Sequence, residues 1–300
     1  MLGLDERELA KVFDRIFDGS YDEAEATLKA VVARLPPEVQ EQLADPDAFA
    51  VGTTDLRFNA SAVPCENGGW AVIIDRRLMT FYFVVALILV HRIPEPESGS
   101  EPPLTLEEAS GIAAELATNV RASGVPLVGE FPTDPARTHL ASDLAVEAHR
   151  FVLSHELAHI ALGHGRASNH VSMLRDLKVP IAEWSWEQEL DADSLAMSLT
   201  LGPPPGPPQW EELAMRYAGC QLALDAVAFL DDYATEILGR GQIATHPPAA
   251  GRLARLRARA DEACADDGAR EAMFRFADEL AQTLDSIRVW LGMLPTVPKA

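Results

Sequence analysis

Two histidines and a glutamate interrupt an otherwise apolar stretch near the middle of this 300-residue chain. The segment HELAHIALGH, residues 155 to 164, places His155 and His159 four positions apart and Glu156 directly after the first of them. Because an α-helix advances roughly 100° per residue, both imidazoles lie on one face, about 6 Å apart along the axis. Two such imidazoles can bind one metal ion, and Glu156 can reach a water molecule in an open coordination position. The alternative is a buried histidine pair satisfied by backbone carbonyls.

A hydrolytic zinc site usually has a third protein ligand, which the sequence must supply elsewhere. In the metzincin pattern this is a histidine six positions after the second one, but Gly165 stands there. His164 would lie about 180° from His155 on a continued helix, so it is a poor ligand. Gly163 could turn the chain and change the direction of the His164 side chain. We therefore expect His164 to contact a metal-ligating residue or the end of the helix.

The segment WEQELDADSLAM, residues 186 to 197, contains two pairs of acids four positions apart. Helical winding places Glu189 and Asp193 in an arc shared with Trp186, Ala196 and Met197, whereas Glu187 and Asp191 face solvent. A carboxylate on an apolar face needs a strong partner, and a cation is the obvious one.

We therefore predict Glu189 as the third ligand. Asp193, one turn on, is placed to accept the free ring N–H of a ligating histidine. The alternative is a helix whose acidic side chains bind no ion.

HELAH followed by ELDAD resembles the gluzincin metallopeptidases, and most closely the HtpX and CAAX-prenyl-protease group. ATHPPAAGRLARLR, residues 244 to 257, is similar to a segment of that group whose histidine and arginine help to bind substrate or stabilise the oxyanion. The resemblance assigns these roles to His246 and Arg252. Taken without the resemblance, the segment is a helix start with arginines along a solvated face. The similarity covers roughly residues 138 to 260.

The resemblance implies a zinc endopeptidase with one Zn²⁺ per chain and a peptide or protein substrate. Membrane members of that group carry several long apolar spans, and this chain has none, since its apolar run at residues 78 to 90 is shorter than the ~20 residues that a span requires. The chain also resembles the Lit-type phage-exclusion peptidases, cytosolic proteins that cut a host translation factor once triggered.

Composition narrows the possible partners and the compartment. A formal charge of −21 without a cluster of basic residues argues against nucleic acid and anionic membranes. Three widely spaced cysteines and an acidic N-terminus without a secretory pattern favour the cytoplasm.

The pattern of elements predicts an α+β fold that is mainly helical, with a zincin-like core and a small sheet. We expect an N-terminal helical segment at residues 1 to 50, the catalytic core at 51 to 202, a proline-rich spacer at 203 to 209, and a helical region at 210 to 300 that completes the site. Residues 70 to 75 predict a strand at a sheet edge, where an extended substrate could add as a further strand. The apolar run that follows predicts a buried helix. Further helices are expected at residues 105 to 122, 138 to 162 and 181 to 201.

A non-hydrolytic module is the main alternative to a peptidase, with zinc bracing the fold or a protein-binding surface. A structural zinc site is normally closed by four ligands, usually rich in cysteine, and has no use for a carboxylate beside an open position. Glu156 therefore favours the enzyme.

Overall fold

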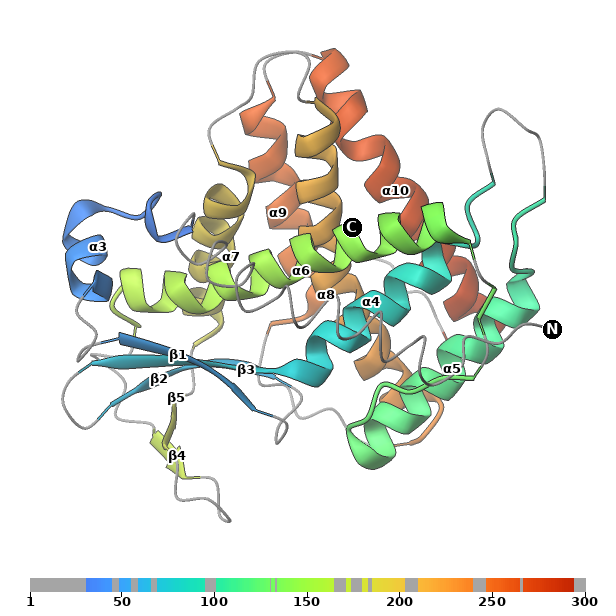
Figure 1. The fold of residues 1–300 in the computed structure, drawn as a ribbon, viewed down its shortest axis with the longest axis horizontal. Helices are drawn as coiled ribbons and strands as arrows, with labels where there is room; N and C mark the ends of the chain where they lie inside the picture. Colours follow the sequence, from blue (N-terminus) through green and yellow to red (C-terminus); the bar gives the residue numbers. More distant parts are fainter. Residues whose placement is uncertain are drawn as a thin grey trace.

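The computed structural model describes residues 31–44, 49–54, 59–65, 69–94, 101–129, 131–132, 134–164, 171–173, 180–182, 185–202, 210–239, 247–264 and 267–293 (Figure 1). The helices in these ranges are α3 (Pro37–Ala44), α4 (Arg76–Val90), α5 (Leu106–Ser123), α6 (Pro135–Ala161), α7 (Trp186–Leu201), α8 (Trp210–Glu236), α9 (Ala249–Ala263) and α10 (Asp267–Trp290). The strands are β1 (Phe49–Thr54), β2 (Ala60–Pro64), β3 (Trp70–Asp75), β4 (Val171–Met173) and β5 (Pro180–Ala182). The fold is thus mainly helical with a small β component, as predicted.

The larger sheet has the strand order β1-β3-β2. β1 pairs parallel to β3, and β2 pairs antiparallel to it, with Ala62 opposite Val72. The strand predicted at residues 70 to 75 is confirmed as β3, but its predicted edge position is wrong because β3 is the central strand. The apolar sequence of β3 reflects its burial between β1 and β2. In the larger sheet, β2 is an edge strand instead.

A short polar turn joins the sheet to the first long helix. The buried Asp75 at the end of β3 accepts a hydrogen bond from the backbone N–H of Arg77 (2.9 Å) and caps the N-terminus of α4. The Arg77 side chain also donates to this carboxylate. Every side chain from Phe81 to Val90 is buried, so the prediction of a buried helix here is confirmed.

Helix α6 runs across the molecule and contacts β2 and β3 of the larger sheet as well as α4, α7 and α8 (Figure 1). Phe151 and the alanines before it pack into the larger hydrophobic core with α4, α8 and α10. Leu153, Leu157 and Ile160 pack into a second core together with β2, β3 and the segment before α3. The C-terminal half of α6 is therefore covered on both sides, which explains why its polar residues are buried.

Gly219 of α8 sits directly against the backbone of α6. A Cβ atom at this position would lie 2.8 Å from the backbone nitrogen of Ala148 and 2.8 Å from the carbonyl carbon of Glu147. Because both neighbours are main-chain atoms, they cannot move aside as a flexible side chain would. The two helices can approach this closely only with glycine here.

We expect Gly219→Ala to lower the free energy of unfolding by about 1–3 kcal/mol, the usual range for overpacking a close contact. Gly111→Ala is the matched control, since Gly111 is exposed within α5 and no atom lies within 4 Å of its Cβ position. That control should raise the stability by up to about 1 kcal/mol. Urea denaturation measures both values, and an unchanged Gly219→Ala protein would contradict the α6–α8 packing.

Helix α8 is the one described helix that is long and apolar enough to cross a membrane, but 67% of that window is buried inside the protein. It packs against α6 and α10. The burial accounts for its apolar sequence, as in the core helix of a globular protein.

The other predicted elements are recovered with shifted ends. The helix predicted at residues 105 to 122 is α5, with Thr105 as its cap in a capping box. The helix predicted at 181 to 201 begins only at Trp186, because residues 180 to 182 form β5. Residues 1 to 30 and the proposed spacer at 203 to 209 lie outside the described residues. The larger core contains residues of α4 and α6, which precede that spacer in the sequence, and residues of α8 and α10, which follow it.

Candidate metal centre

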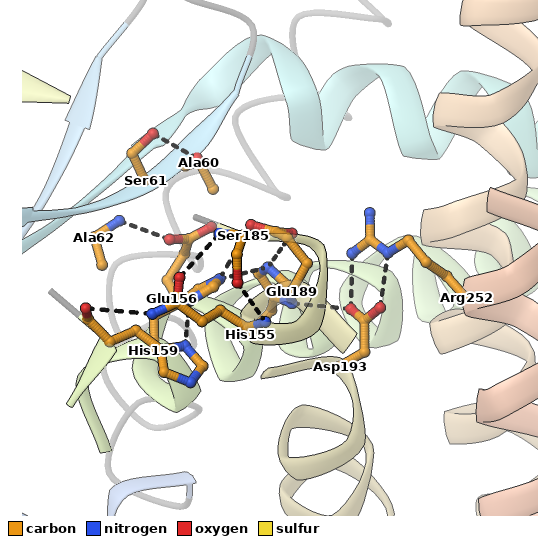
Figure 2. A network of polar contacts seen from close by, with 12 residues as sticks. Ala60, Ser61, Ala62, His155, Glu156, His159, Ser185, Glu189, Asp193 and Arg252 are labelled. Atoms are coloured by element: carbon orange, nitrogen blue, oxygen red, sulfur yellow. Dashed lines mark hydrogen bonds and ion pairs between the residues drawn. The ribbon is translucent and has the colours of Figure 1, made fainter. Parts of the chain in front are cut away.

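Two helices bring the predicted ligands together in the interior. His155 Nε2 lies 3.1 Å from His159 Nε2 and 3.4 Å from one carboxylate oxygen of Glu189. The other oxygen of Glu189 lies 3.5 Å from His159 Nε2. Two ligands of a tetrahedral zinc ion are about 3.4 Å apart when each is about 2.1 Å from the metal. These three buried side chains, which we call the ligand set, therefore fit a metal ion (Figure 2).

A glycine turn completes the surroundings of His159. Helix α6 ends at Ala161, and Gly163 adopts a positive φ of 68°, which favours glycine. The turn directs His164 back to the helix, where its Nδ1 lies 2.9 Å from His159 Nδ1. His164 thus contacts the nitrogen of His159 that faces away from the ligand set.

The first turn of α7 positions Glu189. Ser185 and Gln188 form a capping box at the start of the helix. The Gln188 side chain also donates to the backbone carbonyl of His164 at 3.5 Å, which links α7 to the end of α6. The positive end of the helix dipole stabilises the Glu189 carboxylate.

Two arginines from distant segments bind the last carbonyls of α7. Arg34 donates to the carbonyl of Leu199, and Arg216 donates to the carbonyl of Leu201 at 2.8 Å. These carbonyls have no partner within the helix, so the two cations satisfy them and complement the helix dipole. The start of α7 is therefore linked to the end of α6, and its C-terminus is linked to the segment before α3 and to α8.

Asp193 joins the ligand set to α9. One of its oxygens lies 3.0 Å from His155 Nδ1. Both oxygens accept hydrogen bonds from the buried Arg252, from Nε and from Nη2, each at 2.7 Å. Such a two-point contact fixes the plane of the carboxylate. The sequence did not indicate that Arg252 pairs with Asp193.

Glu156 projects from α6 toward the sheet. Its Oε2 accepts a hydrogen bond of 2.6 Å from the backbone N–H of Ala62 in β2 (Figure 2). The glutamate is 6% exposed, and Ala62 is 2% exposed. The candidate general base is therefore in contact with the edge strand of the sheet.

The centre carries more buried negative than positive charge. Glu156, Glu189 and Asp193 are all buried acids, and Arg252 is the one buried arginine that pairs with any of them among the described contacts. Buried charges require compensation, so the site is suited to a divalent cation.

The pKa values of the histidines respond to this charge. Burial disfavours the charged form of His155, but the carboxylates of Asp193 and Glu189 outweigh it and raise its pKa to about 10. Burial, and then the nearby His155, lower the pKa of His159 to about 2. Burial opposes ionisation of Asp193, but Arg252 and His155 bring its pKa down to about 2. The site thus attracts positive charge and keeps His159 neutral, as a metal ligand must be.

Other residues of the predicted site fall in different places. Glu187 and Asp191 are exposed, as helical phase predicts. Trp186, which we placed on the buried arc, is 54% exposed because it opens the first turn of α7. His246 lies outside the described residues.

The protein is thus mainly helical, with two histidines and a glutamate in its interior that could hold a metal ion and a further buried glutamate beside them. The family model Peptidase U49 matches residues 123–273. The chain belongs to this peptidase family, which includes the Lit-type peptidases. No curated protein and no solved structure matches the chain.

Proposed function

We propose that the protein is a zinc-dependent metalloendopeptidase of the gluzincin type, with a zincin-like core. The observation that carries this proposal is the buried ligand set His155, His159 and Glu189, with Glu156 one residue along α6. Membership of a peptidase family supports the same reaction. Three protein ligands leave a fourth position open, as hydrolytic zinc sites require.

A bound zinc ion would supply a Lewis acid that acidifies water and polarises the peptide carbonyl. Glu156 accepts the proton of the attacking water and delivers it to the leaving amine. Asp193 lies 3.0 Å from His155 Nδ1 and is placed to accept an Nδ1–H there, which would leave Nε2 of this histidine free to bind the metal. The Nδ1 atom of His164 is placed to accept the Nδ1–H of His159, which would leave Nε2 of His159 free in the same way. The oxyanion role of His246 rests on the family resemblance alone.

The contacts of Arg252 support a positioning role. The resemblance assigns it to substrate or oxyanion, but two of its nitrogens hold Asp193. We propose that Arg252 acts through Asp193 on the orientation of His155. The C-terminal region, through α9, would thereby complete the site.

Arg252→Ala should weaken zinc binding by roughly 10–100-fold, the usual effect of losing a group that orients a ligand. It should also destabilise the metal-free protein, because Asp193 would remain buried without its cation. Arg252→Lys should recover only part of the affinity, since an ammonium cannot make the planar two-point contact. Competition with a fluorescent zinc chelator measures the affinity.

Arg255→Ala is the matched control for this prediction. Arg255 lies in the same helix, is 49% exposed, and is 3.9 Å from the exposed Asp191. Its loss should change neither zinc affinity nor stability measurably. Equal zinc affinity in the Arg252→Ala and wild-type proteins would show that Arg252 does not position the ligands.

A metal assay paired with an unbiased cleavage profile tests the proposed function. The purified protein should contain about one zinc per chain and cut peptides in a proteome-derived library. A stoichiometric zinc content without any cleavage would favour the alternative, a zinc-containing regulatory or protein-binding module.

We propose a cytoplasmic peptide or protein as the substrate, and neither nucleic acid nor a membrane as a partner. The strong negative charge supports both exclusions. The three cysteines, all free and none paired in a disulfide, suit a reducing compartment. Shared family membership with the Lit-type peptidases supports a triggered role in phage exclusion.

A further inference from the structure

The hydrogen-bonding groups of β2 alternate in direction along the strand. Asn59 accepts from the backbone N–H of Asp75 at 2.9 Å, and the N–H of Cys65 donates to Gly69 at 2.8 Å. Odd-numbered residues of this segment thus direct their main-chain groups toward β3, and even-numbered residues direct theirs away from it. Since Pro64 has no N–H, the N–H groups that point away from β3 between residues 60 and 64 are those of Ala60 and Ala62, and both residues are buried.

Glu156 uses one of these two donors. The bond from Ala62 N–H is short, at 2.6 Å, and both partners are buried. A charge-assisted bond of this kind is stronger than one between neutral groups. An extended peptide that pairs with the outer edge of β2 needs the same N–H for its ladder. One donor cannot serve the peptide ladder and the glutamate fully at once.

We propose that the Ala62 N–H is a latch on Glu156, and that an extended peptide opens it by pairing with β2. The peptide carbonyl takes over the Ala62 donor, and the Glu156 carboxylate, having lost this bond, can turn toward the attacking water. The protein is then poorly active toward short peptides that do not reach Ala62. This inference rests on the proposed peptidase function and adds substrate-dependent control to it. β5, which belongs to the smaller sheet, also contacts β2.

Proline substitution tests the latch, because it removes one N–H and is tolerated at the outer side of an edge strand. The zinc-loaded full-length protein is assayed as wild type, Ala62→Pro and Ala60→Pro. One probe is a pool of quenched fluorescent decapeptides of randomised sequence, and the other is a pool of quenched dipeptides. Ala62→Pro should raise kcat/KM on dipeptides by about tenfold, since Glu156 no longer has to break a charge-assisted bond. On decapeptides its KM should rise.

Ala60→Pro is the matched control within the same strand. It should raise KM for decapeptides and leave dipeptide hydrolysis unchanged. A fall in kcat on both probes for Ala62→Pro would overturn the latch, because the N–H would then position Glu156 for catalysis. Unchanged dipeptide hydrolysis would overturn it too. If the wild-type protein cuts neither pool, the proposed function fails, and the latch fails with it.

A second measurement uses the wild-type protein, so it does not depend on whether a proline variant folds. A decapeptide that the wild-type protein cuts is made with its scissile amide reduced to CH₂–NH, and the complex is crystallised. The Ala62 nitrogen should bond to a peptide carbonyl, with the Glu156 carboxylate beyond hydrogen-bond distance. A complex in which Glu156 keeps the Ala62 N–H would overturn the proposal.

Discussion

Glu156→Gln should leave the protein folded and loaded with zinc while peptide hydrolysis falls by roughly 10²–10⁴-fold, the usual contribution of general acid–base catalysis. Glutamine is nearly isosteric with glutamate, and its carbonyl oxygen can still accept the hydrogen bond from Ala62. It cannot accept the proton of the attacking water. The expected result is therefore a loss confined to kcat.

Zinc content, melting temperature and the rate on a cleaved peptide are measured on the same preparation. Equal rates for Glu156→Gln and wild type would refute the general-base role. A variant that loses both zinc and activity would show instead that Glu156 supports the ligand set. The zinc measurement therefore separates a chemical role from a structural one.

Glu189→Ala should remove zinc from the protein, with a loss of affinity greater than about 100-fold, because even residues that only orient a ligand contribute 10–100-fold. Its two oxygens lie 3.4 and 3.5 Å from the Nε2 atoms of His155 and His159. Elemental analysis after dialysis against a chelator measures the loss. Peptide hydrolysis should disappear together with the metal.

Glu187→Ala provides the matched control, since the two glutamates are two positions apart in the first turn of α7. Glu187 is exposed, whereas Glu189 is fully buried. The control should retain about one zinc per chain. The ligand assignment would be wrong if both variants lost zinc equally, or if neither did.

Helical geometry explains why the centre could be predicted from the sequence. The spacing of His155 and His159 fixes a shared face, and the phase of α7 separates Glu189 from Glu187. Both arguments need only the regular period of one helix. The long apolar run of α4 could be predicted for a similar reason, because its length and composition describe one continuous element.

Contacts between distant elements could not be predicted in this way. Arg252 lies among several arginines of α9, and the sequence does not show which of them turns inward to Asp193. Ala62 acts through its backbone N–H, a group that every residue except proline carries, so its side chain gives no signal. The edge position assigned to β3 failed because strand order depends on pairing, which alternation within one strand does not encode.

The contact between Asp193 and Arg252 also bears on when this protein becomes active during its synthesis. A ribosome that has released the chain only as far as α7 has exposed all three ligands, but α9 is not yet made. Translation adds about 5–20 residues per second, and domains fold as units. The nascent chain therefore spends several seconds without Arg252, the residue that binds Asp193 beside His155. The order of the helices along the chain thus means that the centre is complete only after α9 has been translated.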